Sequence, residues 1–329
     1  MPAYIVGSGI FLPERVVTNE ELAPQIGIEA AQIFKSSGIR SRRWVAPGTL
    51  TSSIAANAAR AAMQDAGWQP EQLDYLILGT MTPDRFIPGT APAIQTLLGA
   101  GEIPCLDIRA ACCNLVFAIQ LAAALVKSGT ASRIAVCLAE IQSRWLDISA
   151  ASAAISMLFA DGASAVLISS EKHSGALEIV DVLLATDGSH TDALGVRAPG
   201  SGFGFRGEAA DFLPRMAGQS VILNASRKIP AVCLALLERN SLTASEVRWI
   251  VPHQANSNLL AQVARALGFN ATRGLVNVLE NTGNTSSASM GIALDTLRRS
   301  GQLQANDCIL LPAFGAGFIW GAALCRVCH

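Results

Sequence analysis

The stretch that decides the fold reads Cys105-Leu106-Asp107-Ile108-Arg109-Ala110-Ala111-Cys112-Cys113-Asn114. Its first four residues predict a β-strand, and the apolar run after the turn predicts a helix over residues 113–127. A sharp turn from strand to helix exposes a side chain at the end of a sheet, as nucleophile elbows do. The positive end of the helix dipole also favours a thiolate there. Cys112 is therefore a candidate nucleophile, although a lone cysteine is more often a buried core residue.

Cys113 is the competing candidate in the same turn. On a helix it lies about 100° away from Cys112, so we do not expect both thiols to face one site.

Helices and strands alternate outward from this stretch. The apolar patterns predict, in order, helix 52–66, strand 74–79, helix 90–98, strand 105–108, helix 113–127, strand 134–138, helix 221–239, strand 247–252, helix 256–267, helix 287–298, strand 308–311 and strand 319–326. Pro230 is expected to kink or break its helix. This order predicts an α/β fold with sheets covered by helices.

Each half of the chain repeats the order of strand and helix, which suggests an internal duplication. We expect one half to cover residues 1–172 and carry Cys112, and the other to cover residues 173–329 and carry a histidine and an asparagine described below. The stretch 171–218 is rich in glycine and aspartate, so connecting and surface loops are expected there.

The composition argues against several classes of function. Hydrophobic residues make up 51% of the 329 residues and charged residues 15%, which suits a large core and a surface partly buried in an oligomer. The formal net charge is -1 and no long basic run is present, so nucleic acid and anionic membranes have no electrostatic support as partners.

Targeting patterns and cysteine spacing indicate the expected compartment and the expected metal content. The N-terminus lacks the pattern of a signal peptide, and charged residues or glycine interrupt each apolar stretch before it reaches the length of a membrane span. The eight cysteines do not form the paired CxxC motifs of a zinc site. We therefore expect a cytoplasmic protein with reduced thiols, no metal and no membrane contact.

Two polar residues of the second half are candidate partners for Cys112. His253 ends a predicted strand, where a side chain can enter a cleft, although such a histidine is often structural. Asn284 lies in a turn that leads into a predicted helix, where an ordinary helix cap is the simpler explanation. The glycine-rich segment from Phe314 to Gly321 precedes a strand and lacks the Lys-Ser/Thr of a phosphate loop. Its glycines instead allow the backbone to approach a ligand and offer an N–H.

Four segments in this order resemble the motifs of the beta-ketoacyl-acyl-carrier-protein synthase III family, within the thiolase superfamily. They are the turn around Cys112, His253-Gln254-Ala255-Asn256, Gly283-Asn284-Thr285-Ser286-Ser287-Ala288-Ser289 and Gly315-Ala316-Gly317-Phe318-Ile319-Trp320-Gly321. Further similarity at residues 38–43, 159–163 and 215–218 extends the resemblance over essentially the whole chain.

The resemblance implies a thiolase-like fold of five layers, α-β-α-β-α, and a homodimer. It assigns Cys112 as nucleophile, His253 and Asn284 as its partners, and the backbone N–H groups of Cys112 and Ala316 as the oxyanion hole. An acyl group from acyl-CoA or another thioester is then loaded on Cys112. Decarboxylative Claisen condensation joins it to a malonyl-type thioester, on coenzyme A or acyl carrier protein. This chemistry implies no metal or redox cofactor.

Several departures from the family pattern suggest a specialised member. Gln32 and Ser36 stand where the family commonly has a tryptophan and an arginine near the coenzyme A adenine. Ser257 and Asn258 follow the His-Gln-Ala-Asn segment, where an arginine on the carrier-protein docking face is common. Residues 149–154 replace the usual Asp-Arg-Gly segment. Residues 81–84 and 106–110 look closer to relatives that make signalling or secondary metabolites.

The resemblance also implies a substrate tunnel that includes Arg85, Phe86 and Phe314. In the family, the loop with Arg85 and Phe86 lines the acyl tunnel of the partner subunit. An arginine there would pair with the carboxylate of a dicarboxylic acyl group, as in relatives that act towards biotin precursors. A solvated surface arginine is the alternative explanation.

Two other functions stay open at this point. The first is plain acyl transfer to an alcohol or amine, with His253 as general base. The second is a non-catalytic subunit that partners an active paralogue, although such a subunit has no need of Cys112, His253 and Asn284 together.

Overall fold

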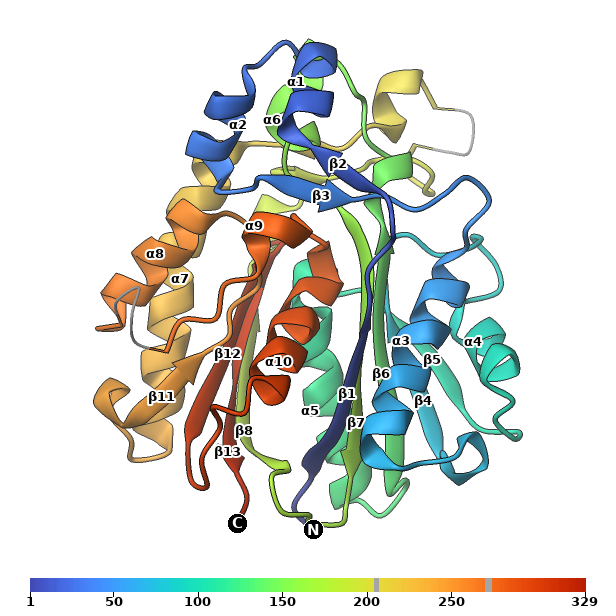
Figure 1. The fold of residues 1–329 in the computed structure, drawn as a ribbon, viewed down its shortest axis with the longest axis vertical. Coiled ribbons are helices and arrows are strands. Elements are labelled where there is room, and N and C mark those ends of the chain that lie inside the picture. Colours follow the sequence, from blue (N-terminus) through green and yellow to red (C-terminus); the bar gives the residue numbers. More distant parts are fainter. Residues whose placement is uncertain (204–206, 270–273) are drawn as a thin grey trace.

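Nine strands form one hydrogen-bonded order in the computed structural model, which describes residues 1–203, 207–269 and 274–329 (Figure 1). We describe this order as two mixed sheets that join at β1 and β8. The strands lie in the order β11-β12-β13-β8-β1-β7-β6-β4-β5. The N-terminal sheet consists of β1 (Tyr4–Phe11), β4 (Tyr75–Gly79), β5 (Cys105–Ile108), β6 (Arg133–Ile141) and β7 (Asp161–Ser169). The C-terminal sheet consists of β8 (Leu177–Thr186), β11 (Val247–Ile250), β12 (Cys308–Gly315) and β13 (Ile319–Val327). Only two residue pairs, Tyr4 with Glu178 and Ile5 with Leu177, join β1 to β8.

The two sheets repeat one strand order. In the N-terminal sheet, β4 pairs in parallel with β5 and β6, and β7 pairs antiparallel with β6 and β1. In the C-terminal sheet, β11 pairs in parallel with β12, and β13 pairs antiparallel with β12 and β8. A parallel bridge between Ile250 and Leu275 occupies the place of a fifth strand. This repetition supports the predicted duplication.

Helices separate and cover the sheets, which gives five layers (Figure 1). Two helices lie between the sheets, two cover the outer face of the N-terminal sheet, and two cover the outer face of the C-terminal sheet. In that order they are α5 (Asn114–Lys127), α10 (Ser289–Arg299), α3 (Thr51–Ala66), α4 (Ala91–Leu98), α7 (Gly218–Arg239) and α8 (Ser257–Ala266). Because α5 is apolar on nearly every side, it can be buried between two sheets. The α/β thiolase-like architecture is confirmed.

The two central helices begin in the same way. A 3₁₀ turn, Ala111–Cys113, precedes α5, and a second, Ser286–Ala288, precedes α10. The first residue of each turn has a positive φ, 45° at Ala111 and 49° at Ser286. The two turns contact each other. The start of α10 therefore lies at the turn that carries Cys112.

Smaller elements complete the described fold. Several form a cap at one end of the sheets (Figure 1), with its own apolar cluster around Leu22, Ile33 and Trp44. They are β2 (Val16–Thr18), α1 (Asn19–Ile26), α2 (Ala30–Ser37), β3 (Ser41–Arg43), α6 (Ala153–Ser156), β9 (Leu194–Gly195), β10 (Arg215–Met216) and α9 (Leu279–Thr282).

Two expectations for the second half are wrong. Residues 177–186, expected among connecting loops, form β8 in the middle of the strand order. Glu178 and Asp181 interrupt the apolar pattern of this strand, which hid it. Pro230 does not break α7, which is continuous, so the break is wrong and the alternative of a kink stays a prediction. The other predicted helices and strands are present with shifted ends.

α7 alone among the described helices is long and apolar enough to cross a membrane. It packs against β8, β12 and β13, and Ala225, Cys233 and Leu236 on it are fully buried in the core beneath the C-terminal sheet. A core helix of this kind passes the same test of length and composition.

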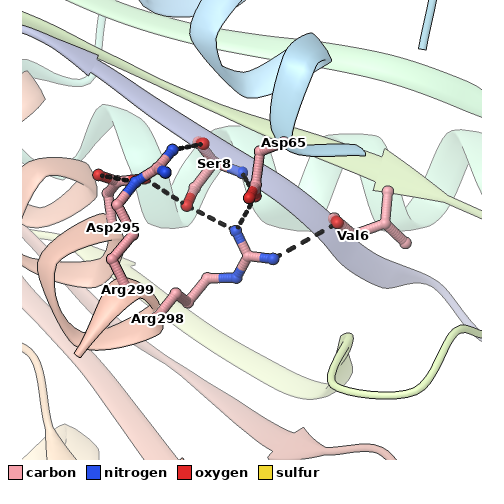
Figure 2. A network of polar contacts seen from close by, with 6 residues as sticks. All are labelled: Val6, Ser8, Asp65, Asp295, Arg298 and Arg299. Carbon is pink, nitrogen blue, oxygen red and sulfur yellow. Dashed lines mark hydrogen bonds and ion pairs between the residues drawn. The ribbon is translucent and has the colours of Figure 1, made fainter. Parts of the chain in front are cut away.

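A network of polar contacts ties α10 to β1 and α3 (Figure 2). The Asp65 carboxylate accepts hydrogen bonds from the Ser8 N–H (3.0 Å) and from Arg298 Nη1 (2.7 Å). Asp295 accepts from Ser8 Oγ (2.7 Å) and pairs with Arg299 (2.9 Å). Burial works to raise the pKa of Asp65, but the Ser8 N–H and the Arg298 guanidinium outweigh it and hold that pKa below its usual range. The network therefore holds a central helix against the N-terminal sheet.

We expect Asp65→Asn to lower the free energy of unfolding by about 1 kcal/mol, because the charged hydrogen bonds that Asp65 accepts from the Ser8 N–H and Arg298 are weakened. The folded-state pKa of Asp65 is depressed, so its stabilisation is present above the ordinary carboxyl pKa and is lost as the pH falls through the lowered value. Urea unfolding at pH 7 and at about pH 3 should therefore show a difference that shrinks in acid.

Asp192→Asn is the matched control. Asp192 is 83% exposed and lies 3.9 Å from Arg197, so its loss should change stability little. Equal effects of the two substitutions at pH 7 would show that the network is not stabilising.

Candidate active site

Cys112 lies in the 3₁₀ turn between β5 and α5. The Ala110 N–H donates to Asn114 Oδ1 (2.6 Å), which fixes the turn, and the positive φ of Ala111 makes the turn sharp. Cys112 is half-buried, whereas Cys113 is fully buried and its Sγ donates to the Ile319 carbonyl (3.4 Å). Only Cys112 faces the site, as predicted. All eight cysteines are free thiols.

His253 and Asn284 reach Cys112 from the other half of the chain. His253 lies in the loop after β11, and Asn284 lies between α9 and the turn that precedes α10. The three side chains and Phe314 line one cavity of about 110 Å³, whose remaining wall is mainly apolar. The structure therefore brings together the three residues that the sequence singled out.

His253 is neutral near pH 7 and its hydrogen bonds favour one tautomer. Burial lowers the pKa of His253 to about 4. Its Nδ1 lies 2.7 Å from Ser289 Oγ, which already accepts a hydrogen bond from the Gln254 N–H (3.1 Å). No other acceptor for the Ser289 hydroxyl lies among the described residues, so this hydroxyl donates to Nδ1. The proton of the neutral imidazole is then assigned to Nε2.

Asn284 is held by its backbone and by its side-chain oxygen. Its N–H donates to the Leu158 carbonyl and its carbonyl accepts from the Ala160 N–H, both at 2.9 Å. Asn284 Oδ1 accepts from the Ser286 N–H (2.8 Å). Among the described residues Nδ2 has no partner, so this N–H₂ group can donate to a bound substrate.

The Cys112 thiol is protonated in the unliganded protein. Burial raises its pKa to about 11, and the charge of Glu140 adds to this rise. The Ser286 hydroxyl, 3.6 Å from Sγ, and the backbone N–H of Cys112 act in the opposite direction. The expectation that the start of the helix favours a thiolate is therefore wrong for the unliganded site, because burial outweighs the hydrogen bonds from the Ser286 hydroxyl and the Cys112 N–H.

The glycine-rich tail packs directly against Cys112. A Cβ on Gly315 would lie 3.0 Å from the Cys112 nitrogen and 3.3 Å from Cys112 Cβ, so only glycine fits there without a shift of the turn. The neighbouring Ala316 lines a second cavity together with Cys112 and Ser286. The tail thus lies against the turn that carries Cys112, and the assignment of the Cys112 and Ala316 N–H groups as an oxyanion hole stays a prediction.

The second cavity, of about 370 Å³, extends from Cys112 to the loop that contains Arg85 and Phe86. The structure thus places the predicted tunnel residues on two sides of Cys112, with Phe314 on the smaller cavity. Both loop residues are also exposed. The larger cavity combines an apolar wall with three arginines, Arg85, Arg109 and Arg215.

Four of the residues that depart from the family pattern, Gln32, Ser36, Ser257 and Asn258, lie on α2 and α8 where these helices meet. Gln32 Nε2 donates to Ser36 Oγ (2.9 Å), and Asn258 Nδ2 donates to the Ser36 carbonyl (3.2 Å). Asn256, which lines the smaller cavity, donates to the same carbonyl (2.8 Å). Uncharged amides and hydroxyls therefore occupy this rim of the site.

Three residues of the site were not singled out from the sequence: Glu140, Ser286 and Ser289. The two serines belong to a run of hydroxyl residues at 285–289, and Glu140 is the only carboxylate in the apolar strand β6. Both patterns can be seen in the sequence, but the residues that these side chains contact in the fold cannot. Among the described residues no group of three or more His, Cys, Asp or Glu side chains is placed to hold a metal ion.

Comparison with known proteins identifies the family. Residues 106–188 match 3-oxoacyl-(acyl-carrier-protein) synthase III, and residues 237–327 match the C-terminal part of the same family. A beta-ketoacyl-(acyl-carrier-protein) synthase III of Hyphomonas neptunium is 37% identical over 99% of both chains. The crystal structure of 3-oxoacyl-(acyl-carrier-protein) synthase III from Aquifex aeolicus superposes with a TM-score of 0.90 at 31% identity, over 98% of this chain and 99% of that one. The priming beta-ketosynthase of a polyketide biosynthetic pathway gives a TM-score of 0.89 at 30% identity, over 98% of this chain and 96% of that one. The chain therefore belongs to the beta-ketoacyl-acyl-carrier-protein synthase III family.

Proposed function

We propose that this protein is an acyltransferase that joins two thioesters by decarboxylative Claisen condensation, with Cys112 as the acyl carrier. The observation that carries the proposal is the meeting of Cys112, His253 and Asn284 in one cavity, with a second cavity open to the same thiol. The smaller cavity suits the carrier arm of the thioester and the larger one suits the acyl group. The names of the relatives support this class of reaction.

In the first half-reaction, Cys112 Sγ attacks the carbonyl carbon of the acyl thioester. The C–S bond to the carrier breaks, and the carrier thiol leaves with the proton that Cys112 gives up. The N–H groups of Cys112 and Ala316 stabilise the oxyanion of the tetrahedral intermediate. Because the thiol is neutral at rest, it loses its proton only as the new C–S bond forms.

In the second half-reaction, a malonyl-type thioester loses carbon dioxide and its electron pair forms an enolate. His253 Nε2–H and Asn284 Nδ2 donate hydrogen bonds to the enolate oxygen. The enolate carbon attacks the acyl group on Cys112, a C–C bond forms, and the C–S bond breaks. The cysteine thiolate then takes up one proton. No cofactor or metal takes part in this sequence.

The substrates and the setting belong to the same proposal. The acyl donor is an acyl-CoA or a related thioester, and the extender thioester rides on coenzyme A or acyl carrier protein. The uncharged rim at Ser36 and Asn258 supports a specialised role, in cofactor-precursor or secondary-metabolite synthesis, over ordinary fatty-acid initiation.

We also propose a cytoplasmic homodimer. The edge strand β5 and the apolar surface hollow beside it, which includes Ile108 and Phe117, support a second copy there.

The two alternative functions fit the site less well. Plain acyl transfer needs His253 as general base, but its Nε2 carries a proton and its pKa is about 4. A non-catalytic partner subunit would have no need for the close packing of Gly315 on Cys112 or for the bonds that orient His253 and Asn284.

The direct test follows both half-reactions. With acyl-CoA, mass spectrometry should find one acyl adduct on Cys112, and Cys112→Ala should abolish it while Cys113→Ala should not. With a malonyl thioester, carbon dioxide should be released, and Asn284→Asp should slow this release by about 100-fold or more, because a charged carboxylate replaces a hydrogen-bond donor. No adduct on Cys112, or normal turnover by Asn284→Asp, would refute the proposal.

We expect Ser289→Ala to slow decarboxylation by about tenfold, the effect of losing one hydrogen bond of about 1.4 kcal/mol. Without the Ser289 hydroxyl, His253 can place its proton on Nδ1 and lose the Nε2–H donor. Acylation of Cys112 does not use that donor, so its rate in the same variant is the internal control. Equal slowing of both half-reactions would indicate a general loss of structure.

The three arginines of the larger cavity favour an acyl group that ends in a carboxylate. Arg215 lies 3.5 Å from Asp211, but Arg85 and Arg109 have no ion-pair or hydrogen-bond partner among the described residues. A guanidinium that borders an apolar cavity without a carboxylate is well suited to receive one from a ligand.

Competing glutaryl-CoA against hexanoyl-CoA for Cys112 tests this specificity, with the two adducts resolved by mass spectrometry. The wild-type protein should prefer the glutaryl adduct, and replacement of both Arg85 and Arg109 by glutamine should reduce that preference by about tenfold or more. Arg60→Gln, far from the cavity lining, is the control. A wild-type preference for hexanoyl would support the solvated surface arginine instead.

A further inference from the structure

Glu140 is a buried carboxyl group that the proposed reaction does not use. It lies near the end of β6 and is fully buried. Its Oε1 accepts from Ser287 Oγ (2.6 Å), and its Oε2 accepts from Thr82 Oγ1 (3.2 Å) and Gln142 Nε2 (3.0 Å). The Met81 N–H donates to both oxygens at 3.2 Å. A buried charge with this many donors but no cation among them is expensive to keep.

The donors belong to two different walls of the site. Met81, Thr82 and Gln142 line the larger cavity. Ser287 follows Ser286, whose hydroxyl lies 3.6 Å from Cys112 Sγ. One carboxyl group therefore fixes the cavity wall on one side of Cys112 and the serine turn on the other.

We propose that Glu140 is a positioning residue of the condensing site, which holds these two walls together and places a carboxylate charge close to the Cys112 thiol. The role assigned to Glu140 rests on the proposed function, but the hydrogen bonds of Glu140 do not depend on that function. Cys112 and Glu140 are separated only by the Ser286–Ser287 turn, in surroundings where charges interact strongly.

The hydrogen bonds around Glu140 can satisfy both of its protonation states. In the ionised state Ser287 donates to Oε1. In the protonated state the proton sits on Oε1 and is donated to Ser287 Oγ, while the Ser287 hydroxyl turns to the Gly79 carbonyl, which lies 3.4 Å away. The other contacts of the carboxyl group come from donors and need no change. Uptake of one proton, with rotation of one hydroxyl, is therefore enough to remove the charge.

The electrostatics of the neighbourhood agree with this geometry. Burial raises the pKa of Glu140 to about 7, although the hydrogen bonds from Ser287, Met81, Thr82 and Gln142 oppose the rise. The charge of Glu140 in turn raises the pKa of Cys112. The other titratable groups on β6 and the strands beside it are Arg133 and Cys137 on β6, Tyr75 on β4 and Asp161 on β7. Arg133 and Tyr75 lie at the opposite end of these strands from Glu140, and Asp161 is bound separately by the Val45 and Ser143 N–H groups. Loss of the charge on Glu140 thus acts mainly on Cys112.

Alkylation of the thiol in the absence of substrate tests the charge effect. The rate of Cys112 alkylation by iodoacetamide is measured against pH, in a Cys105→Ala background because Cys105 is the other half-buried thiol, with the adduct located by mass spectrometry. Glu140→Gln reproduces the protonated group, since its amide N–H₂ can donate to Ser287 and its oxygen can face Thr82 and Gln142. We expect the midpoint of the pH profile to fall by about half a unit or more.

Glu140→Asp separates positioning from charge. This variant keeps the charge but is too short to reach both walls, so kcat for condensation should fall by about tenfold with little change in KM or in the alkylation midpoint. If Glu140→Gln does not fold, Glu140→Met serves in its place, because it also removes the charge with a side chain of similar length and should lower the midpoint in the same direction. Unchanged alkylation profiles in the folded charge-free variants would overturn the charge effect, and a normal kcat in Glu140→Asp would overturn the positioning role. The alkylation assay needs no turnover, so failure of the proposed condensation would be seen separately, as absence of carbon dioxide release by the wild-type protein.

Discussion

Burial of titratable side chains at the junction of the two sheets sets the chemistry of the site. Burial acts in the same sense on three titratable groups, because it disfavours the charged form of each. It raises the pKa of Cys112 to about 11, lowers that of His253 to about 4 and raises that of Glu140 to about 7. The unliganded site therefore holds a neutral thiol, a neutral imidazole and a carboxyl group near its midpoint.

The neutral state of the His253 imidazole decides which reaction these residues can perform. A neutral imidazole with its proton on Nε2 is a hydrogen-bond donor and a poor base, and the Asn284 amide is also a donor. Two donors without a base suit a substrate that develops negative charge by losing carbon dioxide, rather than one that must lose a proton. The same burial strengthens each donor, because a hydrogen bond to a developing charge is worth more in a low-dielectric site.

The sequence was sufficient for the parts of the molecule that depend on local pattern. The strand-turn-helix around Cys112, the segments of His253 and Asn284, and most helices and strands are local, and the structure has them. β8 was missed because Glu178 and Asp181 broke a pattern that only its neighbours in the sheet explain. The low thiol pKa expected from the helix dipole was wrong because burial depends on the whole fold. The partners of Glu140 and Ser289 were out of reach because they come from segments distant in the chain.

The duplication explains why these distant segments meet. Each half carries a central helix that begins after a 3₁₀ turn with a strained first residue, Ala111 in one half and Ser286 in the other. The two turns face each other between the sheets, so whatever one turn carries is held against the other. One of them presents the nucleophile. The other turn carries hydroxyl groups at the equivalent positions. Ser286 lies beside the Cys112 thiol, and Ser287 donates to the Glu140 carboxyl group. A symmetric scaffold has thus been used asymmetrically, with one turn for bond formation and the other for control of the charge beside it.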